Sequence, residues 1–245
     1  MAPAVSLSQV SVRFRLATGG TYAAVEDASL AVAAGEFVAI VGPTGCGKST
    51  LLNVAAGLIA PSSGRIEVFG APLGGLNRQA GYLFQAEALF PWKTALDNVA
   101  IGLETAGVQR GEARERAQTW LGRVGLVQVL IRDPKILLMD EPFGPLDAQT
   151  RQIMGNLLLD LWSADRKAVL FVTHDLEEAI ALSDRVVIMS AGPAARIIGD
   201  WTVKLPRPRD IAEIKIEPAF QDLQREIWAM LKTEVLRGYA QTGGG

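Results

Sequence analysis

The stretch of sequence that decides the fold runs through Gly42, Pro43, Thr44, Gly45, Cys46, Gly47, Lys48 and Ser49. It fits the spacing G-x-x-x-x-G-K-[ST], in which a glycine-rich turn joins a buried strand to a helix. The apolar run 36–41 precedes this stretch, and a helical pattern beginning at Thr50 follows it. Glycines let successive backbone N–H groups point inward, and the N-terminus of the helix adds positive potential. The sequence therefore predicts a phosphate-binding loop over 42–50.

Two side chains of this loop are predicted to bind a nucleotide. Lys48 can bridge the outer phosphates as a point charge, and the Ser49 hydroxyl can ligate Mg²⁺ carried by the nucleotide. Cys46 is interpreted as a small residue that fits the loop, and we assign it no chemistry. The alternative is a glycine turn with an incidental lysine, and the strand and helix on either side of the loop argue against it.

A pair of carboxylates, Asp140 and Glu141, follows the apolar run 136–139. A buried strand there would end at the C-terminal edge of a parallel sheet, where α/β proteins bind ligands. We expect Asp140 to orient the Mg²⁺ shell and Glu141 to accept a proton from the attacking water. The alternative is a solvated turn, and the phosphate-binding loop upstream favours the catalytic interpretation.

Gln85 and His174 also follow predicted strands and are expected at the same edge of the sheet. His174 is the only histidine, and it precedes Asp175-Leu-Glu-Glu178, which is typical of a helical capping box. We predict that His174 hydrogen-bonds the terminal phosphate or holds the water, in preference to a purely structural role. The Gln85 amide could sense the metal or the water while its loop moves.

Short apolar runs alternate with helical patterns along most of the chain. The predicted buried strands are 36–41, 81–84, 135–140, 168–173 and 185–190. This alternation favours an α/β fold with a parallel sheet. Residues 5–35 differ, because they alternate with period two on either side of a Gly19-Gly20 turn. They predict an antiparallel β subdomain beside the main sheet.

Helical segments complete the predicted organisation. The stretch 92–130 predicts a small helical subdomain, and after the turn-rich 205–209 the spacing of apolar residues predicts a C-terminal amphipathic helix packed on its own domain. The apolar positions of that helix are Phe220, Leu223, Ile227, Met230, Leu231 and Val235. We expect a single domain over 1–245, with the antiparallel part at 5–35, the α/β core at 36–85 and 131–205, the helical subdomain at 86–130 and the helix and tail at 206–245. The end, 243–245, is predicted to be disordered.

Composition narrows the class of protein. The 245 residues are 49% hydrophobic, which is enough for a large core. The 24 basic and 26 acidic side chains give a net charge of −2, without the basic surface typical of nucleic-acid binding. A single cysteine forms no internal disulfide, and the start of the chain has no secretion signal. Apolar runs are far shorter than the roughly 20 residues of a membrane span. We therefore expect no nucleic acid partner, a cytoplasmic location, and any membrane role through a partner protein.

In their order along the chain, these motifs resemble those of the ATP-binding-cassette (ABC) ATPases of transporters. The motifs are the loop ending in Gly47-Lys48-Ser49-Thr50, then Gln85, Asp140-Glu141, Gly144-Pro-Leu-Asp147 and His174. The resemblance spans nearly the whole chain. It implies a P-loop NTPase (RecA-like) core that binds ATP and Mg²⁺, with Ser49, Gln85 and Asp140 at the metal.

The same resemblance implies further contacts and partners. Phe14 would stack on the adenine, with Tyr22 as a second candidate, and the region 85–96 would form a groove for a helix of the permease. The stretch 89–99 and the tail 205–234 look most like the importer branch that serves nitrate, sulfonate, taurine or bicarbonate. The family further implies transmembrane permease subunits, indirectly a solute-binding protein, and a place on the cytoplasmic face of the inner or plasma membrane.

One motif of that family is missing. Its members pair head to tail, so that each ATP is held by the phosphate-binding loop of one subunit and by a Leu-Ser-Gly-Gly-Gln-type signature of the other. In this sequence Leu126 is followed directly by Val127, and no signature is present. The absent stretch of roughly 20 residues would compensate the γ-phosphate charge, so its loss is expected to spare ATP binding and lower hydrolysis. Pro145 is a second departure, because it fixes φ and removes an N–H near Asp147, in a loop expected to touch the partner.

Three functions are compatible with these residues. The first is an importer ATPase, either impaired or represented by a sequence that lacks a segment of the working protein. The second is a nucleotide-binding module without turnover that plugs or regulates a permease. The third is a P-loop enzyme unrelated to transport, such as a repair or kinase-like protein, and the stretch 89–92 and the C-terminal helix argue against it.

Overall fold

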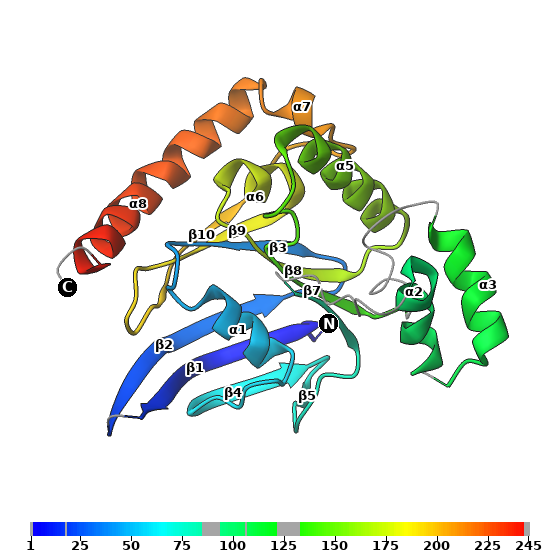
Figure 1. The fold of residues 1–245 in the computed structure, drawn as a ribbon. Helices are drawn as coiled ribbons and strands as arrows, with labels where there is room; N and C mark the ends of the chain where they lie inside the picture. The colour runs from blue at the N-terminus through cyan, green and yellow to red at the C-terminus, as the bar shows by residue number, and fades with distance from the viewer. Residues whose placement is uncertain (1, 18, 85–93, 106, 122–132, 243–245) are drawn as a thin grey trace.

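Two β-sheets with one helix between them form the body of the molecule (Figure 1). The computed structural model describes residues 2–17, 19–84, 94–105, 107–121 and 133–242. Helix α1 (Lys48–Ala55) lies between the sheets, and the helices α5 (Ala148–Ala164), α6 (Leu176–Leu182), α7 (Ile211–Ile214) and α8 (Pro218–Thr242) cover the far side of the larger sheet. The fold is therefore layered, with the predicted α/β core at its centre.

Within the described residues the larger sheet has six strands. Their order is β10 (Ile197–Thr202), β9 (Arg185–Met189), β3 (Phe37–Val41), β8 (Ala168–Val172), β7 (Ile136–Asp140) and β6 (Ala80–Leu83). Strands β9, β3, β8, β7 and β6 pair in parallel, as predicted, and β10 pairs antiparallel with β9 at the edge. The run through β10 was not predicted, because its side chains alternate only between half-buried and exposed.

The central strands read as continuous apolar runs because both of their faces are buried. In β3, Val38 and Ile40 face the cluster shared with α1 and the smaller sheet, whereas Phe37, Ala39 and Val41 face the cluster under α5, α6 and α8. The period-two alternation of a strand thus divides the interior into two cores, one on each side of the sheet.

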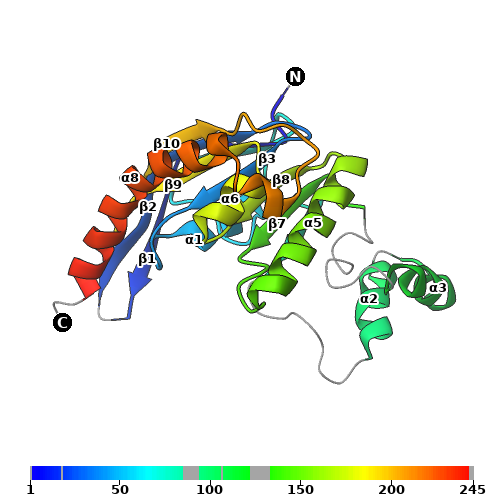
Figure 2. The same cartoon turned by 90° about the horizontal axis from the view of Figure 1, so that it is seen from above.

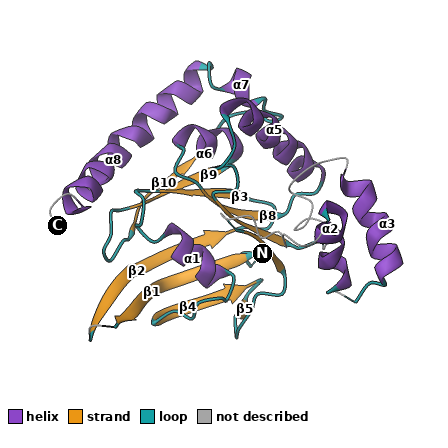
Figure 3. Ribbon diagram, in the orientation of Figure 1, coloured by secondary structure: helices purple, strands orange, loops and turns teal. Residues whose placement is uncertain are grey.

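The smaller sheet is antiparallel, as predicted, and larger than expected. Its order is β2 (Gly20–Val32), β1 (Val5–Leu16), β4 (Ser63–Val68) and β5 (Ala71–Pro72). The last two strands were missed because they come after the phosphate-binding loop in sequence, and the chain returns from α1 to pair β4 with β1. Figure 3 shows this sheet packed below α1.

Helices α2 (Ala95–Glu104) and α3 (Arg110–Leu121) stand apart from the two sheets and pack against each other around Ala100, Leu103, Ala113 and Ala117 (Figure 2). They lie within the predicted helical subdomain, 86–130, of which 86–93, 106 and 122–130 are outside the described residues. None of the described helices combines the length and the apolar character of a membrane span.

The predicted C-terminal helix is α8, and it packs back on its own domain. Phe220, Ile227 and Leu231 are buried in the core under the sheet, and Leu223 and Val235 pack against that core. Met230 is 37% exposed, which corrects its predicted core position. Helical spacing explains this, because Met230 lies on the flank of the stripe centred on Ile227 and Leu231. Residues 243–245 lie outside the described residues.

Candidate functional site

The lysine of the glycine-rich loop is held by backbone carbonyls of the same loop. Lys48 is only 5% exposed, and its Nζ donates hydrogen bonds to the carbonyl oxygens of Gly42 at 2.8 Å and Pro43 at 3.0 Å. It is also the first residue of α1, so its charge adds to the positive end of the helix. The loop therefore presents a positive cradle of the kind that binds phosphate.

Glycine is required at the turn into α1. Gly47 has φ +103°, and a Cβ atom there would lie 2.9 Å from Val25 Cγ2 and 3.1 Å from the carbonyl oxygen of Ala24. Both contacts come from β2, so the smaller sheet shapes the loop from outside. Gly45 also has a positive φ, of +76°, but faces open space.

Ser49 and Asp140 meet across 91 residues of sequence. The Ser49 Oγ donates to Asp140 Oδ1 at 2.9 Å, because α1 begins beside the end of β7. Burial raises the pKa of Asp140, and the bond from Ser49 opposes that shift. A hydroxyl beside a carboxylate is a donor set suited to Mg²⁺, which takes one or two protein ligands and completes its shell with waters and phosphates.

Glu141 and His174 also meet, from the ends of neighbouring strands. His174 Nδ1 lies 3.0 Å from Glu141 Oε2. Glu141 has φ +45°, a backbone conformation that residues other than glycine rarely adopt. Its N–H donates to the carbonyl of Val172 at 2.8 Å. Strained backbone of this kind concentrates at functional sites, so it supports a role for Glu141.

A cavity of about 470 Å³ joins these groups. Its lining residues are Phe14, Tyr22, Ala24, Thr44, Gly45, Gly47, Lys48, Ser49, Thr50, Glu141 and His174. Phe14 and Tyr22 pair across β1 and β2 and are 39% and 38% exposed, so two accessible aromatic rings line the same cavity as the Glu141 carboxylate and the His174 imidazole. Exposed aromatic rings and the Lys48 cation in one cavity together suit a nucleotide.

Some predicted residues lie behind this cavity and not on its surface. Gly42 and Pro43 hold Lys48 through their carbonyls, and Asp140 lies beneath Ser49. Cys46 is 1% exposed, and burial raises the pKa of its thiol, which agrees with assigning it no chemistry. Gln85 lies outside the described residues, as does the stretch 85–93 of the predicted permease groove.

Sequence reasoning missed Tyr82. Its hydroxyl donates to Asn53 Oδ1 on α1 at 2.9 Å, and burial and the neighbouring Asp140 carboxylate raise its pKa. The available signal was a tyrosine three residues before Gln85 on a predicted strand. The capping-box prediction was half right: Asp175 accepts a bond from the Glu178 N–H, but the Glu178 carboxyl contacts Thr173 Oγ1 instead of closing the box.

Comparison with known proteins identifies this constellation. Residues 25–144 match the family model described as ABC transporter. A putative ATP-binding protein of Brucella abortus is 41% identical over 249 residues, covering 93% of each chain. The taurine import ATP-binding protein TauB of Rhizobium johnstonii is 38% identical over 261 residues, covering 96% of this chain and all of the relative.

Solved structures give the same result. The ATP-binding cassette MJ0796, as a dimer in a post-hydrolysis state bound to ADP and Pi, has a TM-score of 0.73 and 25% identity, covering 82% of this chain and all of that chain. A second dimeric structure of this bacterial ABC transporter cassette has the same TM-score at 26% identity. The chain therefore belongs to the ABC transporter family as one of its ATP-binding subunits, and it is an ATPase coupled to transport.

Proposed function

We propose that the chain energises an importer of small anions, with taurine or a related sulfonate as the substrate class. The observation that carries the energising role is the convergence of Lys48, Ser49, Glu141 and His174 on one cavity, with Asp140 beneath it. The substrate class rests on relatives that are 36–38% identical and named taurine import ATP-binding proteins. The nitrate, sulfonate, taurine or bicarbonate branch predicted from 89–99 and 205–234 is in keeping with those names.

The proposed chemistry is the hydrolysis of bound ATP. Lys48 and the N–H groups at the start of α1 bind the phosphates, and Phe14, with Tyr22 beside it, stacks on the adenine. Ser49 and Asp140, with Gln85, would hold Mg²⁺, which would neutralise charge on the phosphates. Glu141 accepts a proton from water, and His174 keeps the Glu141 carboxylate oriented through its 3.0 Å contact.

The proposed assembly is a head-to-tail pair of ATPase subunits on permease subunits at the cytoplasmic face of the membrane, supplied by a solute-binding protein. The dimeric structures of the neighbouring cassette support the pairing. The alignment with the Brucella abortus relative spans 249 positions, which exceeds the 245 residues here, so that relative carries residues that this chain lacks. A missing signature segment would produce such gaps. The comparisons give no support to a module without turnover.

Uptake measurements test the proposal. Cells that lack the protein should recover uptake of radiolabelled taurine when the unaltered chain is restored, and should not recover it with Lys48→Ala. Recovery of nitrate or bicarbonate uptake in place of taurine would correct the substrate class, and recovery by Lys48→Ala would reject ATP-driven import. Sequencing the encoding gene across 126–131 would show whether a signature segment belongs to the working protein.

A further inference from the structure

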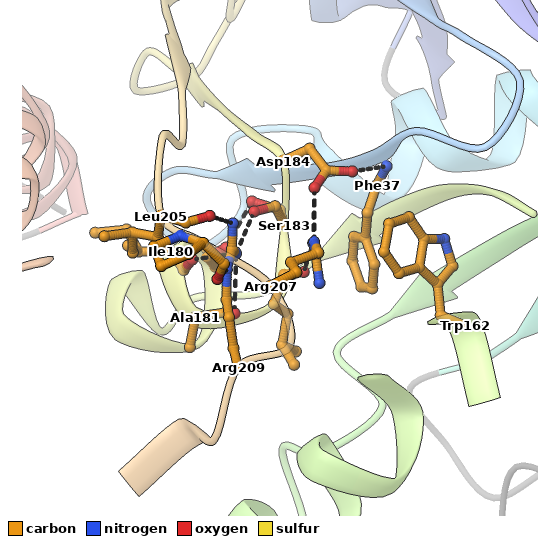
Figure 4. Close-up of polar contacts among 12 residues, drawn as sticks. Phe37, Trp162, Ile180, Ala181, Ser183, Asp184, Leu205, Arg207 and Arg209 are labelled. Atoms are coloured by element: carbon orange, nitrogen blue, oxygen red, sulfur yellow. Dashed lines mark hydrogen bonds and ion pairs between the residues drawn. The ribbon is translucent and has the colours of Figure 1, made fainter. Parts of the chain in front are cut away.

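The C-terminal end of α6 is capped entirely by two arginines from the segment 205–209 (Figure 4). An α-helix leaves its last four carbonyl groups without an intrahelical partner. In α6 these are the carbonyls of Ile180, Ala181, Leu182 and Ser183. Arg209 Nη1 donates to the first, second and fourth at 3.3, 3.1 and 2.7 Å, and Arg207 Nη2 donates to the third at 2.8 Å. Two cations thus also oppose the negative end of the helix dipole.

Arg209 is unusual because every bond that it makes goes to a backbone carbonyl. Its Nη2 and Nε donate to the carbonyls of Leu205 at 3.0 Å and Pro206 at 3.3 Å, and it is only 7% exposed. Burial lowers its pKa to about 10. Buried charges are usually paired with an opposite charge. Arg209 instead binds five carbonyl groups, which indicates that its role is to fix the geometry of the backbone around it.

Arg207 connects the same helix end to the strand that leads into the phosphate-binding loop. Its Nε and Nη2 donate to Asp184 Oδ1 at 3.0 and 2.8 Å, and Asp184 Oδ2 accepts from the N–H of Phe37, the first residue of β3, at 3.0 Å. Its guanidinium also lies 4.3 Å from the ring centroid of Trp162. Figure 4 shows these groups side by side. The segment therefore locks α6, β3 and α5 together.

The other end of α6 holds the loop that carries His174. Asp175 caps the helix, and its own N–H donates to Thr173 Oγ1 at 3.0 Å, so both neighbours of His174 are bonded to the first turn. The seven residues of α6 span about 10 Å, and six of them are buried. Because protein interiors are close-packed, a shift at one end of so short and buried a helix moves the other end.

We propose that Arg209, supported by Arg207, is a positioning residue for ATP hydrolysis: it fixes α6 so that His174 stays within hydrogen-bonding reach of Glu141. The residue touches neither the nucleotide cavity nor the reacting groups, and it acts through the helix. This inference rests on the proposed role of His174 and adds a residue that the phosphate-binding motifs do not include.

The test uses the fact that the chain has a single histidine. In untagged protein labelled with ¹³C-histidine, the imidazole signals report His174 alone. Arg209→Lys keeps the charge but offers three donors for five carbonyls, so we expect it to displace those signals and lower kcat roughly tenfold with little change in the KM for ATP. Leu158→Val, which perturbs the same core from α5, should leave the His174 signals and kcat unchanged at matched fractions folded.

Arg207→Lys gives a second, milder perturbation, because it alters the contacts with Leu182, Asp184 and Trp162 and leaves the five bonds of Arg209 in place. It should displace the His174 signals by less than Arg209→Lys does. If Arg209→Lys does not fold, the displacement in Arg207→Lys alone tests whether the arginines position His174. Unchanged signals in the folded arginine variants would overturn the inference, as would an equal displacement in Leu158→Val. Failure of the unaltered protein to bind ATP would reject the proposed function instead, and the signals would still report whether the arginines position His174.

Discussion

His174 Nδ1 lies 3.0 Å from Glu141 Oε2, although 33 residues separate the two in sequence. The contact exists because β7 and β8 are neighbours in a parallel sheet and both strands end at the same edge. A carboxylate held by an imidazole and backed by a strained backbone is suited to accept a proton from water.

Replacing the proposed base should separate binding from turnover. Glu141→Gln keeps the size of the side chain and a group that can face His174, but it removes the proton acceptor. Steady-state phosphate release is expected to fall by roughly 10²–10⁴-fold, while the ATP-dependent rise in Tm persists. Glu217→Gln, an exposed change directly before α8, serves as the control. Normal turnover by Glu141→Gln would remove Glu141 as the base.

Two glycines of the phosphate-binding loop should differ in their tolerance of a methyl group. At Gly47 an added Cβ meets Val25 and the Ala24 carbonyl in addition to the cost of φ +103°. Gly47→Ala should therefore lower the free energy of unfolding by about 1–3 kcal/mol and abolish the ATP-dependent rise in Tm.

Gly45→Ala is the matched control, because φ is +76° there but no atom lies within 4 Å of the added Cβ. Only the conformational cost applies, roughly 1–2 kcal/mol at most. Chemical denaturation of both variants checks the difference. Equal losses of stability would mean that β2 does not constrain the loop.

Much of the central sheet could be predicted from the sequence, for a physical reason. Strands such as β3 and β7 are buried on both faces, so each is a continuous apolar run, and the loops after them carry the functional residues. Strand β10 is half-exposed and the first half of β4 is exposed, so both lack that signal, and period alone does not distinguish them from loops.

Other features of the site depend on tertiary structure that no local pattern encodes. Three of the partners of Arg209 are carbonyl groups at the C-terminal end of α6, 26 to 29 residues earlier, and every residue type has a carbonyl. Glu141 was predicted from its position after a strand, but neither its positive φ nor the bond from its N–H to Val172 on the neighbouring strand was predicted. Pairing between distant segments therefore limits what the sequence alone predicts.

The buried Glu178 should make stability depend on pH. Burial is the main cause that raises its pKa from 4.5 to about 7, opposed by Thr173, Arg151 and His174 and aided by Asp175. Between these two pH values the folded protein holds a proton that the unfolded chain has released. Stability therefore falls as the pH rises through this window and is constant above it.

Glu178→Gln removes this dependence while keeping an acceptor for the Thr173 hydroxyl. At about pH 8 the variant should be more stable than the parent by up to roughly 3 kcal/mol, and below about pH 4.5 the difference should vanish. Urea denaturation at several pH values measures both limits. A difference that stays constant with pH would show that Glu178 does not titrate in this window.

The aromatic rings of the cavity can be tested apart from its phosphate-binding loop. Phe14 and Tyr22 both line the cavity, and the resemblance to ABC ATPases implies that Phe14 contacts the adenine. Removing a stacked ring typically costs about 1–3 kcal/mol per base, so Phe14→Ala should weaken ATP binding by roughly 5- to 150-fold. Tripolyphosphate has no base, and its affinity for the loop should be unchanged in the same variant.

Calorimetry with ATP and tripolyphosphate distinguishes the two aromatic candidates. Tyr22→Ala should cost less than Phe14→Ala if Phe14 carries the adenine, and more if Tyr22 does. A loss of tripolyphosphate affinity in either variant would mean that the change disturbs the loop itself, since Ala24 and Val25 follow Tyr22 on β2 and pack behind Gly47. Equal affinities for ATP in both variants and the parent would show that the base lies elsewhere.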